Sequence, residues 1–386
     1  MKKYFLFTIL CLTGIFSCTR EHGDDSGEPA KYVNPMIGAS TSTTMARALH
    51  GMGKTVPGAT TPFGAAQVSP NTITGGDNGS GYSDEHQTIE GFAFAQIGTG
   101  AHGDLGNFLV MPANGVFYPI AGKENDPGIK GWRSHYDKQS EQAVAGYYTV
   151  NLTDYDIKAE ATASPHGGIL RFTFPENKQS RIQIDFARRL GGTSTLQYIR
   201  VEDDHHTIRG WMKCPPEGGG LLDGAADYTV YFYAKFSKPL ANYGFWSADI
   251  PDAWRRKDED VISRTYLERV AQSAIIRDKK ALEGKHIGFF TEFPTSEKEE
   301  VNLSVGISFV DMEGAEKNFK AELAGKNFDM IRRAAYEQWN KALGVIEVTG
   351  KSEEEKTIFY TALYHTMFDP RVVSDVDGRY PGPDNR

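Results

Sequence analysis

Residues 31–310 contain short runs in which apolar and polar side chains alternate. A period of two is typical of half-buried β-strands, and Gly, Asn and Pro separate the runs. Short strands at this spacing predict a large β-sandwich. Neither a βαβ rhythm nor an internal repeat is visible. The clearest runs lie at residues 146–152, 157–162, 169–174, 182–186, 228–236 and 301–309.

The period of the pattern changes after Gly314. Residues 316–323 and 328–343 are rich in Ala, Glu, Lys and Arg, and their apolar residues recur three and four positions apart. This spacing predicts two linker helices. A short strand is expected to follow at residues 345–348.

A further helix is predicted near the end of the chain. Ser352 is followed three residues later by Glu355, the pattern of a capping box. We expect the helix to run from residue 356 to about 368, where Asp369 and Pro370 stop it. An amphipathic helix in this place indicates the beginning of a helical layer.

The first residues resemble a bacterial export signal. Lys2 and Lys3 precede an apolar run, residues 5–15, that is too short to span a bilayer as a helix. The run leads to Cys18 after a small residue, as in a lipobox. We therefore expect a lipoprotein signal peptide over residues 1–18, lipidation of Cys18, and a flexible tether over the polar residues 19–30. The alternative is an ordinary signal peptide with an incidental cysteine.

Composition narrows the possible classes of protein. The 386 residues suffice for two or three domains, and the net charge of −8 argues against a nucleic-acid partner, which would require a basic stripe. The cysteines are Cys11, Cys18 and Cys214. Since the first belongs to the signal and the second would carry lipid, neither a disulfide framework nor a cysteine metal cluster is expected.

Two motifs have ordinary explanations. Residues 98–103 match G-x-G-x-x-G, but the following residues 105–112 read as a strand rather than a helix, so we reject a dinucleotide site. Residues 203–206 (DDHH) lie between two strand-like runs, and a hairpin turn explains them better than a metal site. Neither a G-x-S-x-G elbow nor an H-E-x-x-H motif is present.

Three groups of phrases carry a family resemblance. The first group comprises residues 32–38 (YVNPMIG), 57–64 (PGATTPFG) and 68–72 (VSPNT). The second comprises residues 80–83 (SGYS), 89–92 (IEGF), 98–100 (GTG), 103–107 (GDLGN) and 111–112 (MP), and the third comprises residues 359–366 (FYTALYHT) and 374–380 (SDVDGRY). Together, in this order and spacing, they resemble glycoside hydrolase family 92.

The resemblance implies a mainly β architecture that leads into a helical catalytic domain. It implies a β-sandwich over residues 31–313, linker helices and a short strand over residues 314–350, and the start of an (α/α)6-barrel over residues 351–386. It further implies an exo-acting, inverting, calcium-dependent α-mannosidase that acts on mannose-rich glycans. The family's catalytic carboxylates and most calcium ligands would follow Arg386, so we name no catalytic acid or base and expect this chain alone to be inactive.

The same resemblance supplies candidate substrate-binding residues. Asp375 and Asp377 match a segment near the terminal mannose, where a carboxylate accepts sugar hydroxyls; the alternative is that both cap the following turn. The loop with Gly98, Gly100 and His102 matches a sandwich loop at the rim of the active site, and its glycines alternatively serve a tight turn. Relatives carry a histidine before this loop and an aromatic residue within it, and both differences bear on linkage preference.

Two rival functions remain. One is a non-catalytic carbohydrate-binding or structural surface lipoprotein, although such a module has no use for a solitary barrel helix after Ser352. The other is an exo-glycosidase of similar architecture and different sugar specificity. In each case we expect an exported lipoprotein in the periplasm or at the outer-membrane surface, with a glycan and the membrane as partners.

Overall fold

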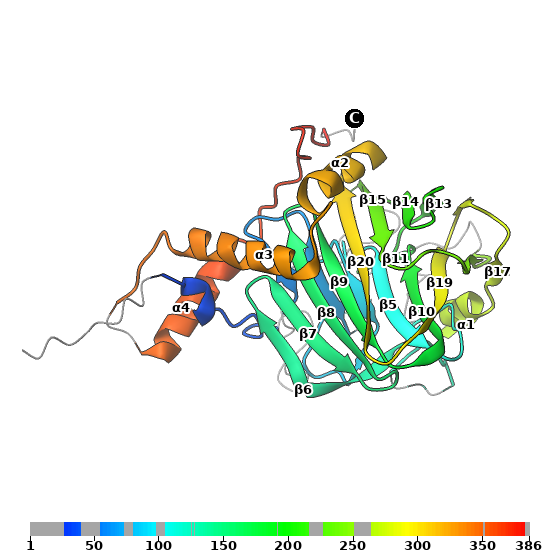
Figure 1. Cartoon of the computed structure of the whole chain (residues 1–386), viewed down its shortest axis with the longest axis horizontal. Coiled ribbons are helices and arrows are strands. Elements are labelled where there is room, and N and C mark those ends of the chain that lie inside the picture. Colours follow the sequence, from blue (N-terminus) through cyan, green and yellow to red (C-terminus); the bar gives the residue numbers. More distant parts are fainter. Residues whose placement is uncertain are drawn as a thin grey trace, which may run out of the picture.

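The computed structural model describes residues 27–39, 55–72, 80–97, 105–124, 126, 128–190, 192–215, 227–250, 264–349 and 352–382. Within these ranges two antiparallel sheets form a sandwich, with helices packed around its outside (Figure 1). The predicted mainly β fold, with a sandwich followed by helices, is therefore confirmed.

Neighbouring strands pair in antiparallel ladders in both sheets. Among the described residues, one sheet has eight strands, in the order β1 (Ala59–Thr60), β2 (Gln67–Asn71), β4 (Gly91–Ala93), β5 (Leu109–Asn114), β10 (Asn177–Asp185), β19 (Ile287–Thr295), β16 (Tyr243–Ser247) and β17 (Ala274–Ile276). The other has ten, in the order β18 (Ala281–Gly284), β13 (Leu196–Val201), β14 (Thr207–Cys214), β15 (Tyr228–Phe236), β20 (Glu299–Ser308), β9 (Gly167–Phe174), β8 (Ile157–Ser164), β7 (Tyr147–Leu152), β6 (Ser134–Val144) and β3 (Thr88–Ile89). A small ladder joins β11 (Arg188–Arg189) to β12 (Gly192–Thr193).

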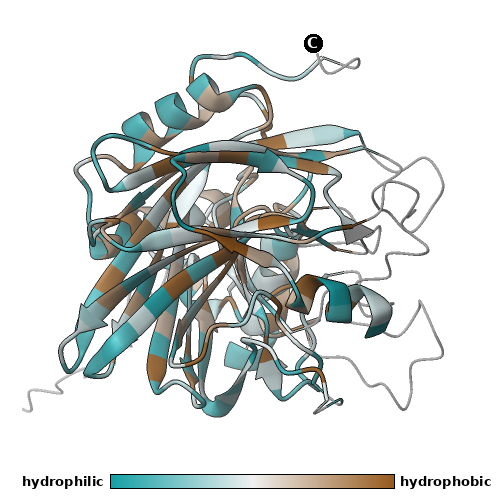
Figure 2. Cartoon of the chain, turned by 90° about the vertical axis from the view of Figure 1, so that its right-hand side faces the viewer, coloured by the Kyte–Doolittle hydropathy of each residue, from teal (hydrophilic) through white to brown (hydrophobic). Residues whose placement is uncertain are grey.

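Alternation along the strands directs apolar side chains into the space between the sheets. On β15, for example, every second side chain from Val230 to Phe236 is buried. The ring of Phe232 stacks on Phe186 at 5.0 Å and meets Phe108 at 4.8 Å, which joins the two sheets. The same alternation is visible as hydropathy stripes in Figure 2.

Four α-helices are described, and they pack at different places on the sandwich. They are α1 (Arg264–Ala271), α2 (Met312–Glu322), α3 (Phe328–Leu343) and α4 (Glu353–His365). The helix α2 contacts β20 and β15, whereas α3 crosses β8 and β9. The 3-10 helix η1 (Pro29–Tyr32) lies against α3 and α4, so the beginning of the described chain meets two helices that follow the sandwich (Figure 1).

A local signal fixed the start of α4 as expected, whereas α2 begins at Met312, four residues before the helix expected at residues 316–323. The side chain of Ser352 accepts a hydrogen bond from the backbone N–H of Glu355, and the Glu355 carboxylate accepts one from the backbone N–H of Ser352. The predicted capping box is thus confirmed. Asp311 and Asn327 cap α2 and α3 in a similar way, each accepting from a backbone N–H three residues later.

Some expectations were wrong in detail. Residues 345–348 form no strand: Val345 and Ile346 are exposed after α3, with no strand beside them among the described residues to complete a ladder. The helix α1 interrupts a region expected to contain only strands and turns. The tether predicted over residues 19–30 ends early, because Pro29 and Ala30 are buried in η1.

The final helix is also shorter than expected. α4 ends at His365 rather than near residue 368, and the backbone N–H of Thr366 closes the last turn on the carbonyl of Ala362. Across the described ranges, the helices are too short or too polar to cross a membrane.

Candidate functional site

The first and third groups of family-like phrases meet where η1 packs on α4. The ring of Tyr32 stacks on Tyr360, with centroids 5.6 Å apart. The backbone N–H of Asn34 donates to the hydroxyl of Thr361 at 2.9 Å. Further along, the backbone N–H of Phe63 donates to the carbonyl of Met367 at 2.7 Å. Residues separated by about three hundred positions therefore form one surface beside the sandwich.

The second group of phrases joins the same region. The buried ring of Tyr82 belongs to one apolar cluster with Trp339 and Tyr364, residues of α3 and α4. The amide of Gln96 donates to the carbonyl of Ser80 at 2.8 Å, which fixes residues 80–83 beside β4. All three groups of phrases thus converge at the junction of the sandwich with α3 and α4.

Asp375 lies in a turn that is pinned to α2 and β20. This segment, the 374–379 turn, is closed by the backbone N–H of Asp375 donating to the carbonyl of Arg379 at 2.7 Å. The Asp375 carboxylate is buried and accepts from the Ser308 hydroxyl at 2.9 Å and from the Asn318 amide at 2.7 Å. Burial raises the pKa of the Asp375 carboxyl, while the hydrogen bonds from Asn318 and Ser308 oppose that rise.

Gly314 makes room for this carboxylate. A Cβ at position 314 would lie 2.0 Å from Oδ2 of Asp375 and 2.8 Å from the hydroxyl of Ser308. The first turn of α2 can therefore approach the 374–379 turn only because residue 314 has no side chain.

Asp377 has a more polar environment. Its carboxylate accepts from the Lys317 ammonium at 3.1 Å and from Nε of Arg379 at 2.9 Å. The hydrogen bond from Lys317 is the main cause that lowers the pKa of Asp377 to about 2. The Arg379 guanidinium also pairs with Asp311, the N-cap of α2.

Asp375 and Asp377 therefore both hold the turn together, one by neutral donors and one by cations. The side chain of Asp377 is 26% exposed and leaves acceptor capacity for sugar hydroxyls, whereas the side chain of Asp375 is 1% exposed and its acceptor sites face the surrounding protein. The predicted role of both residues in substrate binding stays a prediction.

The remaining candidates lie outside the described residues. Gly98, Gly100 and His102, as well as Cys18, fall in ranges that the structure does not describe. The flanks of the 98–104 loop are described: Ala95 bridges Gln67 on one side and Asn107 on the other. The amide of Gln67 donates to the carbonyl of Phe368 at 3.1 Å. The base of this loop is thus beside the end of α4.

Sequence reasoning missed the residues that hold the turn. Ser308, Asn318 and His166 contact it, yet they are distant from it in the chain. Asn318 carried a weak signal, because it occupies the apolar stripe of α2 beside Ala315 and Phe319 and is itself buried. A polar residue on the buried face of a helix requires a hydrogen-bond partner.

Residues 203–206 (DDHH) form a turn, as predicted. Asp204 accepts from the backbone N–H groups of His206 and Thr207, each at 2.9 Å, in the connection from β13 to β14. Searched over the described residues, the structure has no group of three His, Cys, Asp or Glu side chains that could hold a metal ion.

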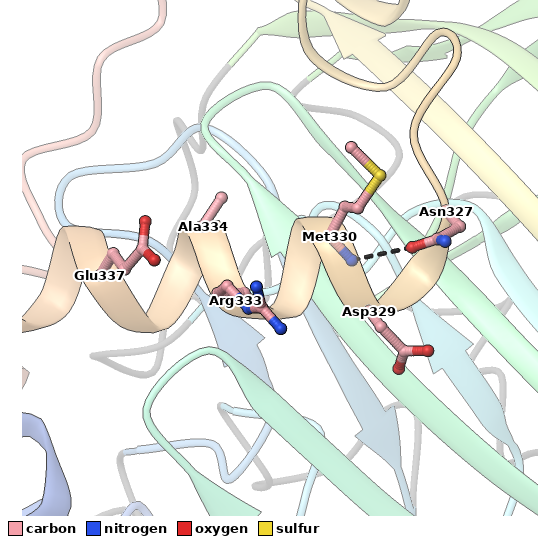
Figure 3. A pocket seen from close by; sticks show the side chains of 6 residues that line it. All are labelled: Asn327, Asp329, Met330, Arg333, Ala334 and Glu337. Atoms are coloured by element: carbon pink, nitrogen blue, oxygen red, sulfur yellow. Dashed lines mark hydrogen bonds between the residues drawn. The ribbon is translucent and has the colours of Figure 1, made fainter.

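A shallow pocket of about 400 Å³ lies on the outer face of α3 (Figure 3). Its lining residues belong to this helix and its N-cap alone: Asn327, Asp329, Met330, Arg333, Ala334 and Glu337. One helix face cannot enclose a sugar, so this pocket is not the candidate site.

Comparison with protein families identifies the family of the chain. The glycosyl hydrolase family 92 N-terminal domain matches residues 32–308, and the family 92 catalytic domain matches residues 314–386. The chain belongs to glycosyl hydrolase family 92. Family 92 membership thus confirms the resemblance carried by the three groups of phrases.

Solved structures agree with this membership. A family 92 α-mannosidase from Bacteroides thetaiotaomicron is 32% identical, with a TM-score of 0.76 over 93% of this chain and 44% of that chain. Its complex with mannoimidazole gives a TM-score of 0.77 at the same identity, over 93% of this chain and 42% of that chain.

A curated relative from Arthroderma benhamiae (strain ATCC MYA-4681 / CBS 112371), described as an uncharacterized secreted glycosidase, is 24% identical over 370 residues. The match covers 92% of this chain and 43% of the relative. The family 92 chain described here therefore spans less than half the length of these relatives.

Proposed function

We propose that the full-length protein, a polypeptide of its relatives' length, is an exo-acting α-mannosidase. It would remove terminal α-linked mannose from mannose-rich glycans with inversion of the anomeric centre. The observation that carries this proposal is the likeness, at 32% identity over 93% of the chain, to a family 92 α-mannosidase solved with mannoimidazole. That compound is named in the complex with the relative, and we extend mannose recognition to this protein.

The part described here would supply substrate binding rather than proton transfer. Inversion needs one carboxylic acid to protonate the leaving oxygen and one carboxylate to activate water across the ring. We place both beyond Arg386, and therefore expect the 386-residue chain by itself to release no mannose. Asp377 would accept hydroxyls of the terminal sugar from the 374–379 turn, and the buried Asp375, bonded to Ser308 and Asn318, would fix the orientation of the turn.

The proposed calcium requirement rests on the family resemblance alone. The described carboxylates near the turn do not fit a cation site, because Asp377 already pairs with Lys317 and Arg379, and Asp375 is enclosed by Ser308 and Asn318. We therefore assign no calcium ligand in this part of the chain and route no step through the ion.

We also propose that the protein is an exported lipoprotein, anchored through Cys18. The polar segment after Cys18 would separate the anchor from the fold, which begins at Pro29. Replacement Cys18→Ala should move the protein from the membrane fraction to the soluble fraction of cell envelopes. Retention of the variant in the membrane fraction would exclude this anchor.

The test of the activity is a panel of aryl α- and β-glycosides, given to the full-length protein with and without a calcium chelator. We expect release of the aryl group from the α-mannoside only, lost with the chelator and restored by calcium. The 386-residue chain serves as the comparison. Release from glucosides or galactosides would favour another exo-glycosidase, and full activity in the chelator would exclude the calcium requirement. An inactive full-length protein that still binds mannose-rich glycans would favour a binding lipoprotein.

A further inference from the structure

His166 joins three elements that are far apart in the chain. It lies in the turn between β8 and β9, and its side chain is 11% exposed. Its Nδ1 is 2.5 Å from Oε1 of Glu322 at the end of α2. Its Nε2 is 2.8 Å from the carbonyl oxygen of Ser374, the first residue of the 374–379 turn. One imidazole therefore connects the sandwich, α2 and the turn that carries Asp375.

Both partners of the ring are acceptors. A backbone carbonyl has no proton, and an ionised Glu322 has none either, so each ring nitrogen must donate. A ring that donates from both nitrogens is an imidazolium. The other oxygen of Glu322 accepts from the backbone N–H of His166 at 2.8 Å, which holds the carboxylate in place as the counter-charge.

We propose that His166 is a positioning residue: its imidazolium holds the 374–379 turn against the sandwich, and loss of one proton releases the turn. The part of this inference that concerns catalysis rests on the proposed function, because the turn carries the candidate sugar-binding carboxylates. The structural part, release of the turn, does not depend on it.

The charges around the ring explain the direction of the effect. Burial disfavours the charged ring, but Glu322 from α2, the Ser374 carbonyl and Asp375 from the turn favour it more strongly, and the pKa of His166 is raised. The Arg379 guanidinium lies 3.9 Å from the Asp375 carboxylate, and its positive charge reduces the effect of Asp375 on the pKa of His166. From β20 the contact is a backbone one, Ile307 N–H to the His166 carbonyl at 2.8 Å.

The sign of the pH dependence follows. A histidine whose pKa is raised by folding contributes stability below its unfolded pKa of about 6.5, and this contribution is lost as the pH rises through the folded value. The remaining proton would stay on Nδ1, where it meets the charged Glu322. The lone pair of Nε2 would then face the Ser374 carbonyl, so the contact with the turn is the one that breaks.

Three variants separate this role from simple packing. His166→Gln replaces the ring by an amide that can donate to Ser374 at every pH. Glu322→Gln keeps an acceptor for Nδ1 but removes the charge, so the release should occur at lower pH. His206→Gln is the matched control, since Nδ1 of His206 also faces a backbone carbonyl, that of Phe236 at 3.0 Å, in the β13–β14 turn.

The experiment measures hydrogen-exchange protection factors of residues 372–380 in the full-length protein, between about pH 6 and about pH 9, on either side of the transition. The backbone N–H groups of Asp375, Val376 and Gly378 are hydrogen-bonded and report on the turn. In the wild type and in His206→Gln we expect protection to fall about tenfold or more, the equivalent of one charge-assisted hydrogen bond. In His166→Gln we expect it to change little.

Enzyme kinetics provide the second readout. The alkaline limb of kcat/KM for α-mannoside hydrolysis should move to lower pH in Glu322→Gln, and should lose its His166 component in His166→Gln. If the full-length protein hydrolyses no mannoside, the proposed function fails, while hydrogen exchange still decides the role of His166. Equal pH dependence of protection in the wild type and His166→Gln would overturn the inference. If His166→Gln does not fold, an unshifted transition in Glu322→Gln would overturn it instead.

Discussion

A single methyl group at position 314 should expel Asp375 from its site. Glycine-to-alanine changes inside helices ordinarily stabilise by about 0.5–1 kcal/mol. In α2 the added Cβ would lie 2.0 Å from Oδ2 of Asp375, a distance that carbon and oxygen cannot adopt. Because the Gly314 backbone is fixed by its hydrogen bond to Asp311, the carboxylate must move.

The cost follows from the contacts that Asp375 would lose. The carboxylate accepts from Ser308 at 2.9 Å and from Asn318 at 2.7 Å, and hydrogen bonds to a charged group contribute about 1.5–3 kcal/mol each. After subtraction of the helix gain, Gly314→Ala should lower the free energy of unfolding by about 2–5 kcal/mol. We would measure it by urea denaturation of the 386-residue chain, followed by circular dichroism.

A double-mutant cycle provides the control. In Asp375→Ala the obstructing carboxylate is absent, so adding Gly314→Ala should cost much less than in the wild type, since the remaining close contact is the Ser308 hydroxyl at 2.8 Å. The two changes should therefore be strongly non-additive, as expected for residues in contact. Wild-type stability in Gly314→Ala, or simple additivity of the two costs, would refute the arrangement of α2 and the turn described here.

Three further predictions concern buried polar groups. Trp339→Phe removes the indole N–H that donates to the Thr60 carbonyl at 2.6 Å, and should cost about 1–3 kcal/mol in urea denaturation with an unchanged m-value; no loss would mean that this bond does not join α3 to the sandwich. Arg371→Met removes a buried guanidinium whose Nε pairs with the Asp369 carboxylate at 3.0 Å and whose terminal nitrogens have no hydrogen-bond partner within the described chain, so the lost pair and the relieved nitrogens should offset one another and stability should change by less than about 1 kcal/mol; a large loss would reveal a partner of the terminal nitrogens. Burial, reinforced by Arg188, lowers the pKa of His286 to about 3, so unfolding takes up a proton and stability should fall as the pH drops from about 6.5 towards 3; an equal slope in His286→Gln would contradict this.

Local patterns in the sequence were sufficient for much of the fold. Alternation predicted strands such as β15 because one face is buried in the sandwich, and Ser352 with Glu355 marked the start of α4 by a contact within one helical turn. The strand expected at residues 345–348 failed for the opposite reason. Alternation there has no partner strand among the described residues, and a strand needs a ladder as well as a pattern.

The candidate site was predictable only in part. The phrase at residues 374–380 located the turn through family resemblance, but the residues that hold it are contributed by β20, α2 and the β8–β9 turn. The His166–Ser374 contact spans 208 positions, and the Ser308–Asp375 contact spans 67. Periodicity and motif spacing predict contacts between residues that are close in the sequence. Contacts between residues far apart in the sequence depend on how the sheets and helices pack against one another.

The most direct test of the account is a crystal structure of the full-length protein bound to mannoimidazole. We predict that the sugar mimic lies beside the 374–379 turn, with a hydroxyl within hydrogen-bond distance of the Asp377 carboxylate, and that Ser308, Asn318 and His166 keep the contacts described here. A ligand bound away from this turn, or a turn released from the sandwich in the complex, would contradict the account.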